Sequence, residues 1–233
     1  MHDIGGDGFD VLTLIPPTSC PGHFDLKPND VQKIRQADLI ICHPYQKDLQ
    51  KVLRQYIQDD QRWFILPEQH SLAIPKYYVE AGQFLLSSLL VHFPEMSASM
   101  KNQWERQRGK IMELEKGYRL RFKKSRAEQY PVLAAYRQKE FVESWGFRVI
   151  GVFDTVDGDT MQNMISLVQK GRQYGVKAGI GNLQNGDQQA KVLSEKLGVP
   201  FIMLSNFPGG EGAAALYEDL LKTNCSKLIG ILM

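Results

Sequence analysis

A stretch without proline at residues 95–126 separates two parts of the chain that have similar patterns. Its composition favours a helix, and its apolar residues recur mostly three, four or seven positions apart. A helix of about 30 residues is roughly 45 Å long, which is enough to connect two lobes. Gly109 and Gly117 are its weak points, because glycine loses more backbone freedom than other residues in a helix. The sequence therefore predicts one long connecting helix.

On both sides of this helix, short apolar runs alternate with segments of helical composition. The predicted strands are 9–15, 39–42, 63–66, 130–134, 148–153, 177–181 and 200–204. The predicted helices are one that begins at residues 27–30 with Asn29 as its cap, and those at 46–58, 77–93, 138–145, 161–174, 188–197 and 213–221. Alternation of strands and helices favours parallel sheets. We predict an α/β fold with two Rossmann-like parallel-sheet lobes, residues 1–94 and 127–233, joined by the long helix.

Composition excludes several classes of protein. Lys and Arg together number 28 and Asp and Glu 26, so the net charge of +2 gives no reason to expect a nucleic-acid partner. The apolar runs are far shorter than the roughly 20 residues of a membrane span. The first residues lack the basic start and apolar stretch of a signal peptide. Three cysteines are too few for a disulfide scaffold. We expect a globular monomer without direct membrane insertion.

Histidine and cysteine side chains follow the predicted strands of the first lobe. Cys20 and His23 follow the first strand, His43 the second and His70 the third. Ligands of parallel sheets bind beyond the carboxyl ends of the strands. Imidazole and thiolate are preferred ligands of transition metals. These four residues form a candidate metal site, and the alternative is that they are ordinary loop histidines and buried thiols.

The loops of the second lobe carry neutral amides. Asn182, Gln184 and Asn206 lie in glycine-rich segments after predicted strands. Because amides both donate and accept hydrogen bonds, they suit a polar or oxyanionic ligand better than a bare divalent cation. The alternative is that they only cap turns. No motif of a nucleophilic, zinc-hydrolase or nucleotide-binding enzyme is present, so we do not expect an enzyme.

The chain resembles the metal-type solute-binding proteins of ABC importers, the zinc and manganese class. Residues 21–31 resemble a Pro-His…Pro-Ser-Asp loop of that class, 37–41 its next strand and 70–75 its His-x-Trp-x-x-Pro element. Residues 146–151 and the last helix fit its second lobe. The resemblance covers nearly the whole chain. It implies a ligand in a cleft between the lobes, an ABC permease as partner and a periplasmic or extracytoplasmic location.

The resemblance also implies a ligand set, from which this chain departs. His23 stands one position after the first histidine of the class, and its third histidine falls near Ala135, where no ligand is present. Amides stand where the class has carboxylates. These departures imply a divergent branch whose ligand is a divalent transition metal (zinc, manganese or iron) or a metal chelate. The metal-facing residues implied are His23 and His70, with Cys20 and His43 as nearby candidates and with Asn182, Gln184 and Asn206 as ligand-binding residues of the second lobe.

Two alternatives remain open. A chelatase-like two-lobed α/β enzyme would also use a histidine in an interlobe cleft. A degenerate member of the class would bind a non-metal ligand or keep an empty cleft. By the resemblance, the first strand and helix of the class are missing before residue 9, so the first lobe is expected to be incomplete.

Overall fold

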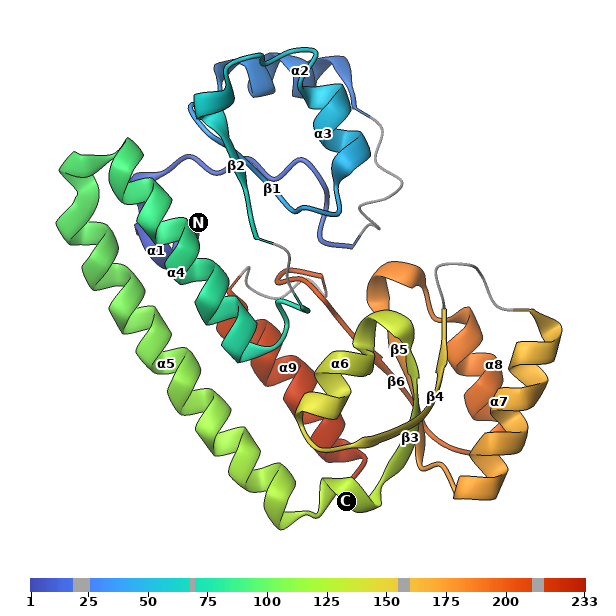
Figure 1. Cartoon of the computed structure of the whole chain (residues 1–233). Helices are drawn as coiled ribbons and strands as arrows, with labels where there is room; N and C mark the ends of the chain where they lie inside the picture. The colour runs from blue at the N-terminus through green and yellow to red at the C-terminus, as the bar shows by residue number, and fades with distance from the viewer. Residues whose placement is uncertain (19–25, 68–69, 155–159, 211–215) are drawn as a thin grey trace. The chain divides into compact units, whose positions relative to one another are not determined.

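The computed structural model places the predicted elements in two compact units (Figure 1). It describes residues 1–18, 26–67, 70–154, 160–210 and 216–233. Unit 1 comprises Met1–His70 and Lys76–Arg108, and unit 2 comprises Ser71–Pro75 and Gly109–Met233. The boundary between them lies inside the long helix α5 (Ser97–Lys124), which was predicted at 95–126.

Unit 1 contains a two-stranded parallel sheet with short helices. Strand β1 (Ile40–Cys42) pairs with β2 (Trp63–Ile65). The helices are α1 (His2–Gly5), η1 (Gly6–Gly8), α2 (Pro28–Gln36), α3 (Lys47–Leu53), η3 (Asp60–Arg62), α4 (Pro75–His92) and η4 (Pro94–Met96). Its core is formed by Ile34, Ile40, Cys42, Leu53 and Ile57. Ile40 and Cys42 of β1 thus pack against α2 and α3, whereas Ile65 of β2 is 38% exposed.

Two predictions for unit 1 are wrong in detail. Residues 9–15 form no strand. Leu14 packs against the core, but Leu12 is 47% exposed, so the apolar pattern is buried only in part and without ladder hydrogen bonds. Asn29 does not cap α2. Instead, Lys27 is the N-cap, its backbone N–H donates to the Asp30 carboxylate at 3.1 Å, and Pro28 takes the first helical position.

Unit 2 contains a four-stranded parallel sheet in the order β4-β3-β5-β6. The strands are β3 (Pro131–Ala135), β4 (Arg148–Phe153), β5 (Ala178–Asn182) and β6 (Phe201–Leu204). The helices are η5 (Ala127–Gln129), α6 (Tyr136–Ser144), α7 (Met161–Tyr174), η6 (Leu183–Asn185), α8 (Gln188–Leu197) and α9 (Tyr217–Gly230). Each predicted strand of this unit is confirmed within one residue at either end. Residues 213–215 of the predicted last helix lie outside the described residues.

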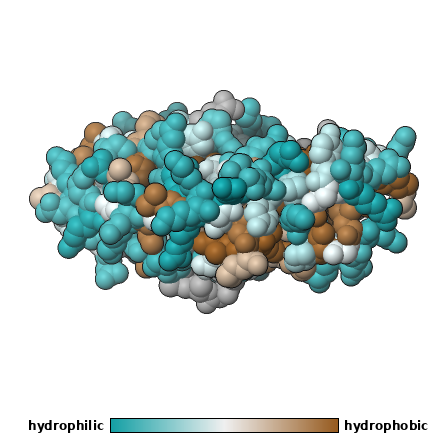
Figure 2. All heavy atoms as spheres, turned by 90° about the horizontal axis from the view of Figure 1, so that it is seen from below, coloured by the Kyte–Doolittle hydropathy of each residue, from teal (hydrophilic) through white to brown (hydrophobic). Residues whose placement is uncertain are grey.

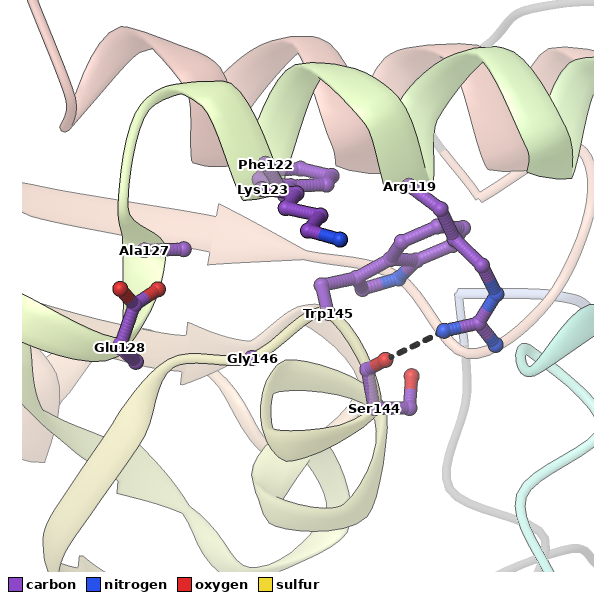
Figure 3. Close-up of a pocket in the computed structure, with 8 residues that line it drawn as sticks. All are labelled: Arg119, Phe122, Lys123, Ala127, Glu128, Ser144, Trp145 and Gly146. Atoms are coloured by element: carbon purple, nitrogen blue, oxygen red, sulfur yellow. Dashed lines mark hydrogen bonds between the residues drawn. The ribbon is translucent and has the colours of Figure 1, made fainter.

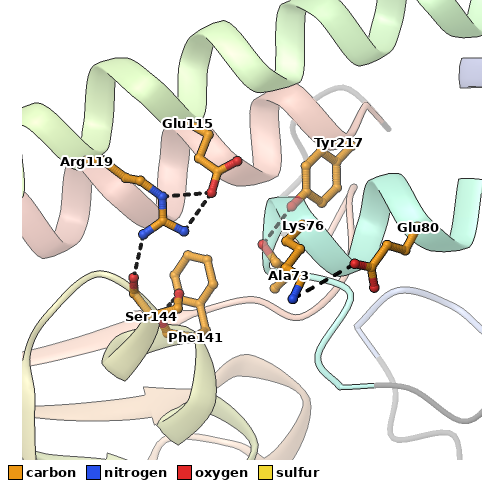
Figure 4. Close-up of polar contacts among 8 residues, drawn as sticks. All are labelled: Ala73, Lys76, Glu80, Glu115, Arg119, Phe141, Ser144 and Tyr217. Carbon is orange, nitrogen blue, oxygen red and sulfur yellow. Dashed lines mark hydrogen bonds and ion pairs between the residues drawn. The ribbon is translucent and has the colours of Figure 1, made fainter.

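Helices cover both faces of the unit 2 sheet, as predicted for an α/β fold. Helices α6 and α9 lie on one face, and α7 and α8 lie on the other (Figure 1). All residues of β3 and β5 are buried, which explains their continuous apolar runs. Figure 4 shows two contacts that hold this unit together: Tyr217 Oη donates to Ala73 O at 2.7 Å, and Arg119 Nη1 donates to Ser144 O at 3.0 Å.

The strand order creates a switch point between β3 and β5. The chain leaves β3 through α6 to reach β4 on one side, and later reaches β5 on the other side. At such a point, the loops beyond the carboxyl ends of the two central strands diverge and leave room for polar groups or ligands. In this protein, β3 is followed directly by α6, and β5 is followed directly by η6.

The face of the molecule seen in Figure 2 is predominantly polar. Hydrophilic residues cover most of the face in Figure 2, and hydrophobic residues show between them. Such a mixture is usual for folded proteins. None of the helices that the structure describes is both long enough and apolar enough to cross a membrane.

Candidate functional site

A cluster of amide side chains lies at the switch point of the unit 2 sheet. Gln138 Nε2 donates to Asn182 Oδ1 and to Asn206 Oδ1, each at 2.9 Å. Asn206 Nδ2 donates to Asn182 Oδ1, also at 2.9 Å. Gln138 lies in the first turn of α6, Asn182 ends β5 and Asn206 follows β6. The cluster therefore joins the carboxyl ends of three neighbouring strands.

The interior of this cluster is closed to water. Gln138 and Asn182 are both fully buried, whereas Asn206 is half-buried. Gln138 Oε1 has no hydrogen-bond partner among the described residues. A buried unsatisfied acceptor costs about 1–3 kcal/mol of stability. The side chain is therefore retained at a cost, as is frequent for residues of a functional site.

Residues behind the cluster fix the loop after β6. Gln184 Oε1 accepts from the Asn206 backbone N–H at 3.1 Å, and Gln184 Nε2 donates to Ser205 Oγ at 3.1 Å. Asn224 of α9 holds the Ser205 backbone on both sides, because its Oδ1 accepts from Ser205 N at 3.1 Å and its Nδ2 donates to Ser205 O at 2.8 Å. The three predicted residues Asn182, Gln184 and Asn206 are thus brought together in one hydrogen-bonded network.

Sequence reasoning missed Gln138 and Asn224. Asn224 had a visible signal, because it is a polar residue on the same helical face as Leu220, Leu221 and Leu228. Gln138 follows the predicted strand 130–134 by four residues, but its position opposite β5 and β6 depends on the strand order.

In unit 1, His43 directly follows β1, as predicted. Its ring stacks on Tyr45 with 5.0 Å between ring centroids. Its backbone N–H donates to Gln46 Oε1 at 2.8 Å, and its carbonyl accepts from Gln50 Nε2 at 2.8 Å. Burial lowers the pKa of His43, so the imidazole is neutral at neutral pH, which is the form that binds metal ions.

Cys42, the neighbour of His43, has a different environment. It is 3% exposed and belongs to the core of unit 1. Burial raises the pKa of its thiol to about 11, so the thiol is protonated at neutral pH. Since a metal binds the thiolate, Cys42 has the chemistry of a core residue.

His70 is an exposed residue before α4. Its ring stacks on Tyr77 of α4 with 4.3 Å between centroids and 19° between planes. Cys20 and His23, the other two predicted metal-facing residues, lie outside the described residues. Among the residues described, no group of three or more His, Cys, Asp or Glu side chains could hold a metal ion.

A separate pocket of about 220 Å³ lies where α5, η5 and the turn after α6 meet (Figure 3). Arg119 and Trp145 line it, with 5.2 Å between the guanidinium carbon and the ring centroid. The other lining residues are Phe122, Lys123, Ala127, Glu128, Ser144 and Gly146. None of the predicted site residues lines this pocket, so it is distinct from the amide cluster.

The comparisons with known proteins agree with this fold. A family model described as zinc-uptake complex component A, periplasmic (ZnuA) matches residues 1–72. The Mn-bound and Cd-bound structures of a periplasmic metal binding protein from Candidatus Liberibacter asiaticus each have a TM-score of 0.82 at 18% identity, covering 100% of this chain and 94% of theirs. A crystal structure of ZnuA has a TM-score of 0.83 at 13% identity with the same coverage. A comparison with curated protein sequences gave no match.

These findings confirm the resemblance to metal-type solute-binding proteins and the predicted α/β fold class. The family model supports the resemblance over residues 1–72, and the solved structures establish the fold over the whole chain. The descriptions of this family model and these structures name metal-binding and zinc-uptake proteins.

Proposed function

We propose that this protein is a metal-binding solute receptor of an ABC importer. It binds a divalent transition metal, zinc, manganese or iron, as the ion or as a metal chelate, in the periplasm or its extracytoplasmic equivalent, and delivers it to a membrane permease. The observation that carries the proposal is the amide cluster of Gln138, Asn182 and Asn206 at the switch point of a sheet. This fold is shared with periplasmic metal-binding proteins.

The proposed metal-facing residues come from unit 1. They are His23 and His70, with Cys20 and His43 as further candidates. Neutral imidazoles bind zinc, manganese and iron without carrying charge themselves. The lowered pKa of His43 supports this role for that residue at neutral pH.

The proposed contribution of unit 2 is hydrogen bonding by neutral amides. Asn182, Gln184 and Asn206 add no negative charge to balance a dication. A chelate whose oxygens are anionic brings its own compensation and offers acceptors for amide N–H groups. The chemistry of these residues therefore favours a metal chelate over the bare ion.

The proposal is tested by binding of Zn²⁺ and Mn²⁺, each alone and as its citrate complex. A ligand at 100 times its Kd stabilises the folded state by about 2.7 kcal/mol. For a chain of this length, the melting temperature should then rise by about 5–10 °C. Calorimetric titration measures the affinity, and elemental mass spectrometry of protein purified without chelators or a histidine tag measures the bound metal.

The double variant His23→Ala/His70→Ala separates the proposed site from incidental binding. We expect it to lose at least tenfold in affinity, because two metal ligands are removed and a tenfold loss corresponds to only about 1.4 kcal/mol. His2→Ala, at an exposed position of α1, is the matched control and should bind like the parent. Absence of binding by all four probes, and by Fe²⁺ alone and as its citrate complex, would overturn the proposed function, and an unchanged double variant would overturn the ligand assignment.

A further inference from the structure

The amide of Gln138 has only one orientation that satisfies its neighbours. Its Nε2 lies 2.9 Å from both Asn182 Oδ1 and Asn206 Oδ1, and 3.5 Å from Leu204 O. All three neighbours are oxygens that accept hydrogen bonds. If the amide were turned over, Oε1 would face three acceptors without any hydrogen between them. The amides of Gln138, Asn182 and Asn206 are therefore oriented together as one set, and the Leu204 carbonyl is the acceptor in it that cannot turn.

In this set, the carbonyl oxygens of both asparagines face Gln138. Their carbonyl oxygens both accept from Gln138, and Asn182 Oδ1 also accepts from Asn206 Nδ2 at 2.9 Å. Asn182 Nδ2 in turn donates to Asn185 Oδ1 at 2.7 Å. The carbonyl oxygens that a cation would need are thus already engaged with one another's amide groups.

The accessible residues of the cluster have amide hydrogens that are not used in hydrogen bonds within it. Asn206 is half-buried and Asn185 is exposed. The second hydrogen of the Asn206 amide and both hydrogens of the Asn185 amide have no acceptor among the described residues. The only cluster oxygen without a donor, Gln138 Oε1, is buried.

We propose that Gln138 is a specificity-determining positioning residue. By holding the carbonyl oxygens of Asn182 and Asn206, it makes the amide cluster a donor surface that selects an anionic, oxygen-rich metal chelate over the bare metal cation. This inference rests on the proposed function and names the ligand class of the same site.

The variant Gln138→Glu inverts this arrangement. A carboxylate only accepts hydrogen bonds, so the amides of Asn182 and Asn206 must turn their NH₂ groups toward it. The Asn206 carbonyl then accepts from the turned Asn182 amide, and a negative charge is added beside the cluster. We expect the ratio of the Kd for Zn²⁺ to the Kd for zinc citrate to fall by about tenfold or more, the effect of one charged hydrogen bond.

Gln173→Glu is the matched control, because it makes the same chemical change at an exposed position of α7 in the same unit. Its ratio of Kd values should equal that of the parent. A merely structural role for Gln138 would weaken both probes equally and leave the ratio unchanged. If Gln138→Glu does not fold, as judged by circular dichroism, Asn206→Asp at the half-buried position supplies the test and should shift the ratio in the same direction.

The possible results distinguish a failure of the proposed receptor function from a failure of the role proposed for Gln138. If the parent binds neither Zn²⁺ nor zinc citrate, and none of the other metal probes named above, the proposed function fails, and the role of Gln138 falls with it. If the parent binds zinc citrate more tightly and the ratio falls in the folded variant, the inference is supported. If the parent prefers Zn²⁺, or if the folded variant keeps the parental ratio, the inference is overturned while the receptor function stands.

Discussion

His92, at the end of α4, has both ring nitrogens close to backbone carbonyl oxygens. Nδ1 lies 2.9 Å from Ser88 O, and Nε2 lies 3.0 Å from Gln61 O. Because carbonyl oxygens only accept, the ring can donate to both of them only when it is protonated. The hydrogen bonds to Ser88 and Gln61 raise the pKa of His92 above its usual 6.5. The protonated ring thus links α4 to η3 within unit 1.

Because of these hydrogen bonds, part of the free energy of unfolding depends on pH. Since the pKa is higher in the folded state than in the unfolded state, the stabilisation is fully present below about pH 6.5 and is lost as pH rises through the folded pKa. We predict that His92→Gln lowers the free energy of unfolding more at pH 5.5 than at pH 8. The effect is small, because the ring is exposed to solvent. Urea unfolding of both proteins at the two pH values measures it, and an equal loss at both would contradict this account.

At the scale of elements, packing between β5 and α8 leaves no room for a side chain at Gly179. A Cβ atom there would collide with Ser194 Oγ of α8. Gly109 in α5 is the opposite case, because a Cβ atom there would meet nothing within 4 Å. Glycine is therefore required at residue 179 by the close packing of α8, whereas at residue 109 it only weakens the helix.

The substitution of alanine at these two glycines should therefore have opposite effects. Gly179→Ala should lower the free energy of unfolding by about 1–3 kcal/mol, because it overpacks the sheet against α8. Gly109→Ala should raise it by about 0.5–1 kcal/mol, because alanine loses less backbone freedom in a helix. Denaturant titration compares the two variants. A loss of stability in Gly109→Ala would show that α5 is packed more closely there than we describe.

The elements also show which parts of the fold could be predicted from the sequence. The strands of unit 2 could, because each is a short, mostly apolar run bounded by helical segments, and the two central strands β3 and β5 are buried throughout. The strand at 9–15 was a wrong prediction from the same kind of pattern. An alternating apolar segment becomes a strand only when a neighbouring strand pairs with it. The local sequence does not show whether such a partner strand exists.

At the scale of the whole molecule, the candidate site was predictable only in part. Asn182, Gln184 and Asn206 follow strands in the sequence, so the rule for parallel sheets identified them. Their mutual hydrogen bonds through Gln138 follow from the order β4-β3-β5-β6, which no local pattern contains. The roles of His23, His70, Cys20 and His43 remain predictions that binding measurements have to decide.

We propose that this protein binds a divalent transition metal, and that the metal is held as a chelate. Mass spectrometry under non-denaturing conditions, on the purified full chain mixed with zinc citrate, tests it most directly. We predict a complex whose mass exceeds that of the chain by one zinc ion together with citrate, and its loss in the His23→Ala/His70→Ala variant. A bare chain at every zinc citrate concentration would contradict the receptor function, and a complex with zinc but without citrate would contradict the chelate.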